Sequence, residues 1–182
     1  MVSTKQMVMN LVTLSLVLLS AFTNPVVSYP VPEKGPGHLF YIQRSLNRNT
    51  VVYEANFDEQ GNLDAANPVK IYWVMYEKEG NIEELTYLER KFAYGINFHP
   101  VENQPNVFDI RMVSYDTLRL CLKQTAPYNA IITFSDDSKE QQLDHIYIHG
   151  NNAGLFSKVD YLEVYTNQGE NSDLTRKTIT IE

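Results

Sequence analysis

Apolar and polar residues alternate along most of the chain, which is the pattern of strands that bury one face. In TVVYEANF, residues 50–57, Val51 and Tyr53 begin a run in which every second side chain is apolar. The same period of two recurs between short polar turns and predicts about nine strands. We expect them at residues 39–44, 50–57, 70–76, 107–115, 118–124, 128–135, 143–150, 159–166 and 177–182.

Residues 82–94 depart from this period and predict one α-helix. Asn81 is a good N-cap, and Glu84, three positions later, can reach back to it in a capping box. Gly95 is expected to end the helix in a left-handed conformation. The segment therefore carries helix signals at both of its ends.

Three apolar residues of this segment, Leu85, Leu88 and Phe92, fall on one helical stripe, which we expect to pack against the sheet. The strand at residues 70–76 is apolar or aromatic on both faces and is expected in the middle of the sheet. Together these patterns predict a mainly β, single-domain antiparallel β-sandwich or barrel of about nine strands, with one α-helix at about 82–94.

The first 28 residues predict a secretory signal peptide. Lys5 supplies a positive charge, Leu11–Phe22 supplies a short apolar core, and small residues precede Tyr29 at a plausible cleavage site. The expected division is a signal peptide at 1–28, a Pro/Gly-rich leader that acts as a tether at 29–38, and one β-rich domain at 39–182.

The alternative for this stretch is an uncleaved membrane anchor. Even when counted from Met7, the apolar run is shorter than the roughly 20 residues that a spanning helix needs. Polar residues at Asn10, Thr13 and Ser15 also interrupt it. We therefore expect an exported chain, periplasmic or secreted, with no stable membrane span after cleavage of the signal.

The net charge of the chain limits the partners it is expected to bind, and its cysteine content shows what must stabilise the fold. The net charge of −7 becomes −8 when Lys5, the only charged residue of the predicted signal, is removed. Nucleic acid and anionic membranes attract clustered Lys and Arg, so neither is an expected partner. Cys121 is the only cysteine, so no intrachain disulfide can form and the fold must rest on its hydrophobic core.

The string HIYIH places His145 and His149 four positions apart. On a strand this spacing separates the side chains by about 13 Å, too far for zinc, whose bonds to nitrogen are about 2 Å. No metal site and no cofactor are expected. Asp144 precedes His145, but neighbouring strand residues point to opposite faces, so the pattern predicts no catalytic pair there. The catalytic residues, if any exist, stay unknown.

Aromatic, amide and arginine side chains gather in the first half of the domain. Such a combination suits a carbohydrate or another polar ligand. The candidate ligand-binding residues are Arg44, Asn47, Asn49, Trp73, Arg90 and Tyr94. The alternative is structural, with Trp73 in the core and Arg90 paired with an acid on the surface.

The chain resembles a domain of unknown function, number 4833 of that series, found chiefly in exported bacterial proteins. The resemblance rests on LFYIQRSLNRNTVVYEANFD, PVKIYWVMY, LTYLERKFAYGI and VDYLEVY, and covers residues 39–165. It implies one domain and an extracytoplasmic setting, and it supplies no catalytic residues.

These observations favour an exported binding or accessory module without catalysis of its own, whose partner is a glycan or a protein. One alternative is a small extracytoplasmic hydrolase, which predicts a cleft holding a histidine of shifted pKa. The other is a structural partner in an envelope protein assembly, which predicts a large exposed apolar patch.

Overall fold

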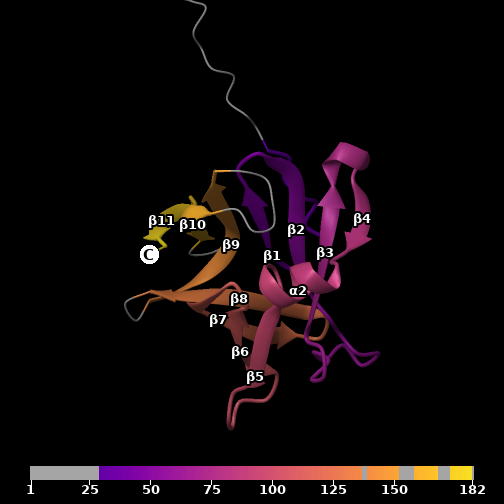
Figure 1. Cartoon of the computed structure of the whole chain (residues 1–182). Helices are drawn as coiled ribbons and strands as arrows, with labels where there is room; N and C mark the ends of the chain where they lie inside the picture. The colour runs from indigo at the N-terminus through magenta and orange to yellow at the C-terminus, as the bar shows by residue number, and fades with distance from the viewer. Residues whose placement is uncertain (1–28, 137–138, 152–157, 168–172, 182) are drawn as a thin grey trace, which may run out of the picture.

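The computed structural model describes residues 29–136, 139–151, 158–167 and 173–181. Within these residues, eleven strands form one sheet that curls into a half-barrel (Figure 1). The strands are β1 (His38–Arg44), β2 (Asn47–Ala55), β3 (Val69–Met75), β4 (Asn81–Glu84), β5 (Ile96–Pro100), β6 (Val107–Met112), β7 (Tyr115–Ala126), β8 (Asn129–Asp136), β9 (Lys139–Gly150), β10 (Val159–Asn167) and β11 (Thr175–Thr180). Two short helical segments are η1 (Tyr76–Lys78) and α2 (Tyr87–Phe92). The predicted mainly β fold is confirmed.

The long strand β9 organises the sheet because both of its edges are paired. β8 and β1 pair along successive parts of β9, and β10 pairs along its opposite edge and carries β11. The remaining order runs β4-β3-β2-β1 on one side and β8-β7-β6-β5 on the other. The pairing of β1 with β9 is parallel, whereas every other pairing of the described strands is antiparallel. The sheet is therefore mixed rather than wholly antiparallel.

The core lies inside the curl, where residues far apart in the sequence meet. Tyr53, Ile110 and Leu122 are each 0% exposed, and all three belong to faces that the alternation predicts to be buried. The phenol ring of Tyr53 stacks on Phe40 with ring centroids 4.1 Å apart. Since the chain has a single cysteine, this packing carries the stability that a disulfide framework would otherwise supply.

Two of the eleven strands, β4 and β5, were not predicted. β5 ends in a proline, and β4 has only four residues, so neither carries a long alternation. Both lie at the ends of the sheet order, where a strand needs only one pairing partner. Strand β3 lies between β2 and β4, and its Trp73 is buried.

The predicted helix begins too early. α2 covers Tyr87–Phe92, its N-cap is Thr86, and the capping box is formed by Thr86 and Glu89. Residues 81–84 instead form β4 against β3, which satisfies their backbone groups in the sheet.

The predicted apolar stripe is also wrong for two of its three members. Leu85 is buried, but it precedes the helix. Leu88 is 49% exposed and Phe92 is 51% exposed, so α2 does not bury a face against the sheet.

Gly95 does not have the left-handed conformation that the sequence suggests. The described glycines with positive φ are Gly37, Gly61 and Gly80. A Cβ on Gly95 would lie 1.8 Å from the carbonyl oxygen of Arg90. Glycine is therefore required here because the backbone passes directly against the end of α2.

No helix among the residues described by the structure has the length and apolar character needed to cross a membrane.

Candidate functional site

Three rings on neighbouring strands form a continuous stack. His145 on β9 is in register with Tyr41 on β1 and with Tyr165 on β10. Its ring lies 4.9 Å from the ring of Tyr41, at an interplanar angle of 4°, and 4.1 Å from the ring of Tyr165, at 10°. Side chains directly opposite each other on paired strands are spaced closely enough to make such contacts.

A second group of rings lies two and four positions further along β9. The ring of His149 stacks on Tyr161 of β10 at 3.9 Å, and Tyr147 leans on His149 at 4.6 Å. Because residues i, i+2 and i+4 of a strand share a face, both groups belong to one surface. We call this surface the Tyr–His face, made of Tyr41, His145, Tyr147, His149, Tyr161, Glu163 and Tyr165.

Glu163 joins the rings of β9 and β10 at the centre of this face. One of its carboxylate oxygens lies 3.1 Å from Nε2 of His149 and accepts a hydrogen bond of 3.1 Å from the hydroxyl of Tyr165. Its other oxygen accepts a 3.0 Å bond from Arg176 of β11. Burial raises the pKa of Glu163, but these hydrogen bonds outweigh burial and the net shift is downward. The carboxylate is thus held charged among the rings.

A β-bulge brings Asp144 to the same side as His145. On β10, Thr166 and Tyr165 are consecutive, but their partners on β9 are Leu143 and His145, so Asp144 is the extra residue. The bulge rotates its carboxylate to within 2.7 Å of Nδ1 of His145. The expectation that these neighbours point apart is therefore wrong, because it assumes a regular strand.

The carboxylate of Asp144 is charged and is bonded to two side chains, His145 and Lys34. The hydrogen bond with His145 lowers its pKa to about 2; burial opposes this shift, and a 2.5 Å bond from Lys34 adds to it. The phenol groups behave in the opposite way. Burial raises the pKa of Tyr41, Tyr147 and Tyr165, so their hydroxyls stay neutral and can both donate and accept hydrogen bonds.

Residues 29–37, which we call the N-terminal strap, border the Tyr–His face. The strap contains no helix or strand, yet it does not hang free as a tether would. The carbonyl of Pro30 accepts a 2.6 Å bond from Gln43, and the ring of Tyr29 packs against Tyr147 at 5.3 Å. The strap thus packs beside the rings as part of the folded chain.

The described residues of this face contain part of a general-base pair but no nucleophile bonded to it. Asp144 orients the imidazole of His145, as in a general-base pair. However, among the described residues no hydroxyl or thiol is hydrogen-bonded to the other ring nitrogen as a nucleophile. Cys121 lies on β7, and burial raises its pKa, which makes the thiol unreactive. Within the described part of the chain, no three His, Cys, Asp or Glu side chains could hold a metal ion.

Three of the six residues predicted to bind a ligand do meet, but inside the fold. Arg44 donates a 3.3 Å hydrogen bond to the hydroxyl of Tyr94, and Trp73 packs edge-on against Tyr94 at 5.1 Å. The indole nitrogen of Trp73 donates to Glu89 at 3.2 Å. Exposed fractions of 6% for Arg44, 8% for Trp73 and 4% for Tyr94 leave little surface for a ligand.

The other three predicted residues do not extend this cluster into one surface. The side-chain oxygen of Asn47 accepts from the backbone of Asn49 in the turn between β1 and β2. That of Asn49 accepts from the backbone of Glu77 in η1. Arg90 is exposed and lies 3.5 Å from Glu84. Ligand binding by these six residues stays a prediction.

The sequence does contain a signal for the Tyr–His face. HIYIH and YLEVY each place His, Tyr or Glu at every second position, with aliphatic residues between them. Such strands have one aliphatic face and one face of polar aromatics. The sequence does not show that β10 pairs with β9 so that these two faces align, or that β1 pairs with β9 in parallel.

Of the comparisons with known proteins, the one with protein families finds a match, and it is the family that the sequence resembles. No curated protein and no solved structure shows significant similarity to the chain. One family, described as Domain of unknown function (DUF4833), matches residues 40–177, from β1 into β11. The match includes every residue of the Tyr–His face. The chain therefore belongs to the DUF4833 family.

Proposed function

We propose that this chain is an exported, non-catalytic binding module that holds a polar, hydroxyl-rich ligand, such as a glycan, on the Tyr–His face. One observation carries the proposal: stacked tyrosine and histidine rings stand in register on three neighbouring strands. Side chains of a sheet stand roughly perpendicular to it. Their stacked faces are covered by one another, so the polar edges of the rings form the surface.

Those edges match a ligand rich in hydroxyl groups. A neutral phenol can donate and accept a hydrogen bond, and so can a sugar hydroxyl. Tyr41 and Asp144 are only 3% and 8% exposed, so they hold the rings in place rather than face a ligand. The partly exposed carboxylate of Glu163 adds acceptors beside the rings, and Arg176 of β11 adds donors. Among the described residues, no group is hydrogen-bonded to the hydroxyl of Tyr161, which leaves it available to a ligand.

Export is the second part of the proposal. It is supported by the charged start, the apolar core at residues 11–22 and the small residues before Tyr29. If the chain is exported and cleaved as proposed, the protein recovered outside the cytoplasm begins at Tyr29. Recovery of the uncleaved chain in the cytoplasm would contradict export without affecting the binding proposal.

A thermal-shift screen of the full chain against a panel of soluble oligosaccharides tests the binding proposal. An oligosaccharide at about 100 times its dissociation constant should stabilise the fold by about 2.7 kcal/mol. Tyr161→Phe removes one hydroxyl and keeps the ring on His149, so affinity should fall about fivefold, the equivalent of one hydrogen bond. Tyr87→Phe removes a hydroxyl from the exposed surface of α2 and should change nothing.

Two results would overturn the proposal. One is a panel in which no oligosaccharide raises the melting temperature. The other is a ligand whose affinity is equal in Tyr161→Phe, Tyr87→Phe and the unchanged chain.

A further inference from the structure

An apolar cavity of about 110 Å³ lies on the opposite side of β9 and β10 from the Tyr–His face. Ile146 of β9 and Leu162 of β10 alternate with the residues of that face and line the cavity. Leu118 of β7 and Met112 of β6 line it from another part of the sheet. The hollow therefore lies between two parts of the curled sheet.

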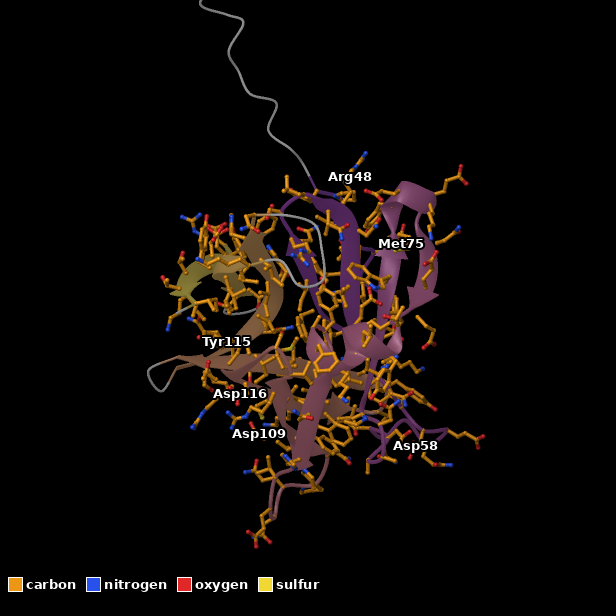
Figure 2. All side chains as sticks on the ribbon, viewed as in Figure 1. Arg48, Asp58, Met75, Asp109, Tyr115 and Asp116 are labelled. Atoms are coloured by element: carbon orange, nitrogen blue, oxygen red, sulfur yellow. The ribbon has the colours of Figure 1, made fainter. Side chains whose placement is uncertain are left out.

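The cavity has a closed apolar floor and a more open rim. Ile42, Met112, Leu118 and Ile146 are at most 4% exposed and form the floor. Ser114, Tyr115 and Val159 are more exposed, and the two hydroxyl groups of the lining belong to the first two of them. Tyr115, labelled in Figure 2, is the first residue of β7, and only Val113 and Ser114 separate it from the end of β6.

We propose that this cavity binds the hydrocarbon chain of a small, uncharged amphiphile, whose hydroxyl-type head lies at the rim beside Ser114 and Tyr115. This site is separate from the ligand of the Tyr–His face and does not depend on it.

The size and lining of the cavity define the hydrocarbon part. A single water needs about 10–15 Å³ of such volume, so this hollow is several waters large, but apolar walls offer water no partners. Empty apolar cavities of comparable size, about 150 Å³, stay dry and take up small hydrocarbons. A hydrocarbon chain would restore the dispersion contacts that the floor side chains lack.

The rim defines the head of the ligand. Ser114 and Tyr115 supply hydroxyl groups, which pair with another neutral hydroxyl. Lys158 and Asp160, on either side of Val159, are both exposed and opposite in charge. The lining of the cavity itself contains no charged side chain, so an alcohol fits it better than a fatty acid or an amine.

A titration of the full chain with a series of 1-alkanols, from butanol to decanol, tests this proposal. The readout is the methyl NMR signals of Ile146, Leu118 and Met112. These signals report binding in the cavity, whereas an alkanol that binds the apolar N-terminal segment leaves them unchanged. Affinity should rise about fourfold for each added methylene and then level off once the cavity is filled. The affected methyl signals should be those of the cavity.

Two variants block the cavity from different strands. Ile148→Phe and Val159→Phe each place a ring in it and should lower the affinity for octanol at least tenfold. Since both positions are only half-buried, a larger side chain can be accepted without repacking the floor. Tyr147→Phe, on the opposite face of β9, is the matched control and should bind octanol normally.

The proposal is overturned if alkanols leave the cavity methyl signals unchanged. It is also overturned if affinity keeps rising through decanol equally in the blocked variants, because that behaviour is partitioning onto any apolar surface. If Ile148→Phe fails to fold, equal binding by Val159→Phe and the unchanged chain is by itself a contradiction.

Discussion

Asp144 and His145, neighbours along β9, are joined by a contact of 2.7 Å between a carboxylate oxygen of Asp144 and Nδ1 of His145. In a regular strand these two side chains would point to opposite faces. The β-bulge at Asp144 turns its carboxylate toward the imidazole and toward Lys34 of the N-terminal strap. One irregular residue thus connects the strap, the stacked rings and the charge of the Tyr–His face.

Acid should unfold the protein partly through Asp144. Its pKa is about 2 in the folded state and near 3.8 when unperturbed, so its contribution is fully present above about pH 4. That contribution, about 2 kcal/mol, is lost as the pH falls through about 2. Asp144→Asn should therefore be less stable at pH 7 and lose less stability between pH 4 and pH 2. Denaturant unfolding at a series of pH values measures this, and parallel profiles for the two proteins would contradict it.

His38 should affect the stability of the fold in a different pH range from Asp144. Burial, followed by the charge of Lys34, lowers its pKa from 6.5 to about 4. The unfolded histidine therefore binds a proton more readily, and stability falls as the pH decreases from about 6.5 to about 4. The Nε2 atom of His38 is buried without a hydrogen-bond partner, so His38→Phe removes no hydrogen bond of that atom. Melting temperatures from pH 7 to pH 4 should fall less in His38→Phe, and an equal fall would exclude this role for His38.

Gly95→Ala should be strongly destabilising. Its new Cβ would meet the carbonyl oxygen of Arg90 at 1.8 Å, and that oxygen belongs to the backbone, which cannot swing away like a side chain. We expect a lower melting temperature and unwinding of the C-terminal end of α2. Gly35→Ala is the control, because its Cβ would meet nothing within 4 Å and should leave stability nearly unchanged. Equal melting temperatures for the two variants would show that the close approach is not needed.

Glu89 should link the start of α2 to the core. Its carboxylate accepts from the backbone and hydroxyl of Thr86 and from the indole of Trp73. Glu89→Ala should cost about 1 kcal/mol through the lost cap and should change the fluorescence of Trp73, the only tryptophan.

Arg90→Ala is the matched control for Glu89→Ala. Its exposed ion pair with Glu84 contributes little, so stability and fluorescence should not change. If Arg90→Ala shifts the fluorescence as much as Glu89→Ala does, the link through Glu89 is wrong. Arg90→Ala should also keep the fold intact. Among the six candidate ligand-binding residues it is therefore a better test of ligand binding than a substitution of the buried Trp73 or Tyr94.

The strand faces could be predicted because the information is local. Alternation in residues 118–122 places Leu118, Leu120 and Leu122 on one face whatever the strand pairs with, and all three are buried. The helix start could not be predicted in this way. Asn81 with Glu84 and Thr86 with Glu89 are both possible capping boxes. The pairing of β4 with β3, a contact between separate segments, decides between them.

The Tyr–His face depends on contacts of the same non-local kind. The sequence shows two strands, around Tyr147 and Glu163, that each carry a polar aromatic face. It does not show that the two faces align, that Tyr41 joins them through a parallel pairing, or that a bulge redirects Asp144. Conversely, Trp73 and Arg44 attract attention as candidate ligand contacts, but their neighbours bury them.

The measurement that tests the central claim most directly is a calorimetric titration of the oligosaccharide that gives the largest thermal shift. It compares the full chain with Tyr161→Phe and Tyr87→Phe. The account predicts normal binding by Tyr87→Phe and about fivefold weaker binding by Tyr161→Phe. Undiminished binding by Tyr161→Phe, or no oligosaccharide that binds at all, would contradict a ligand site on the Tyr–His face.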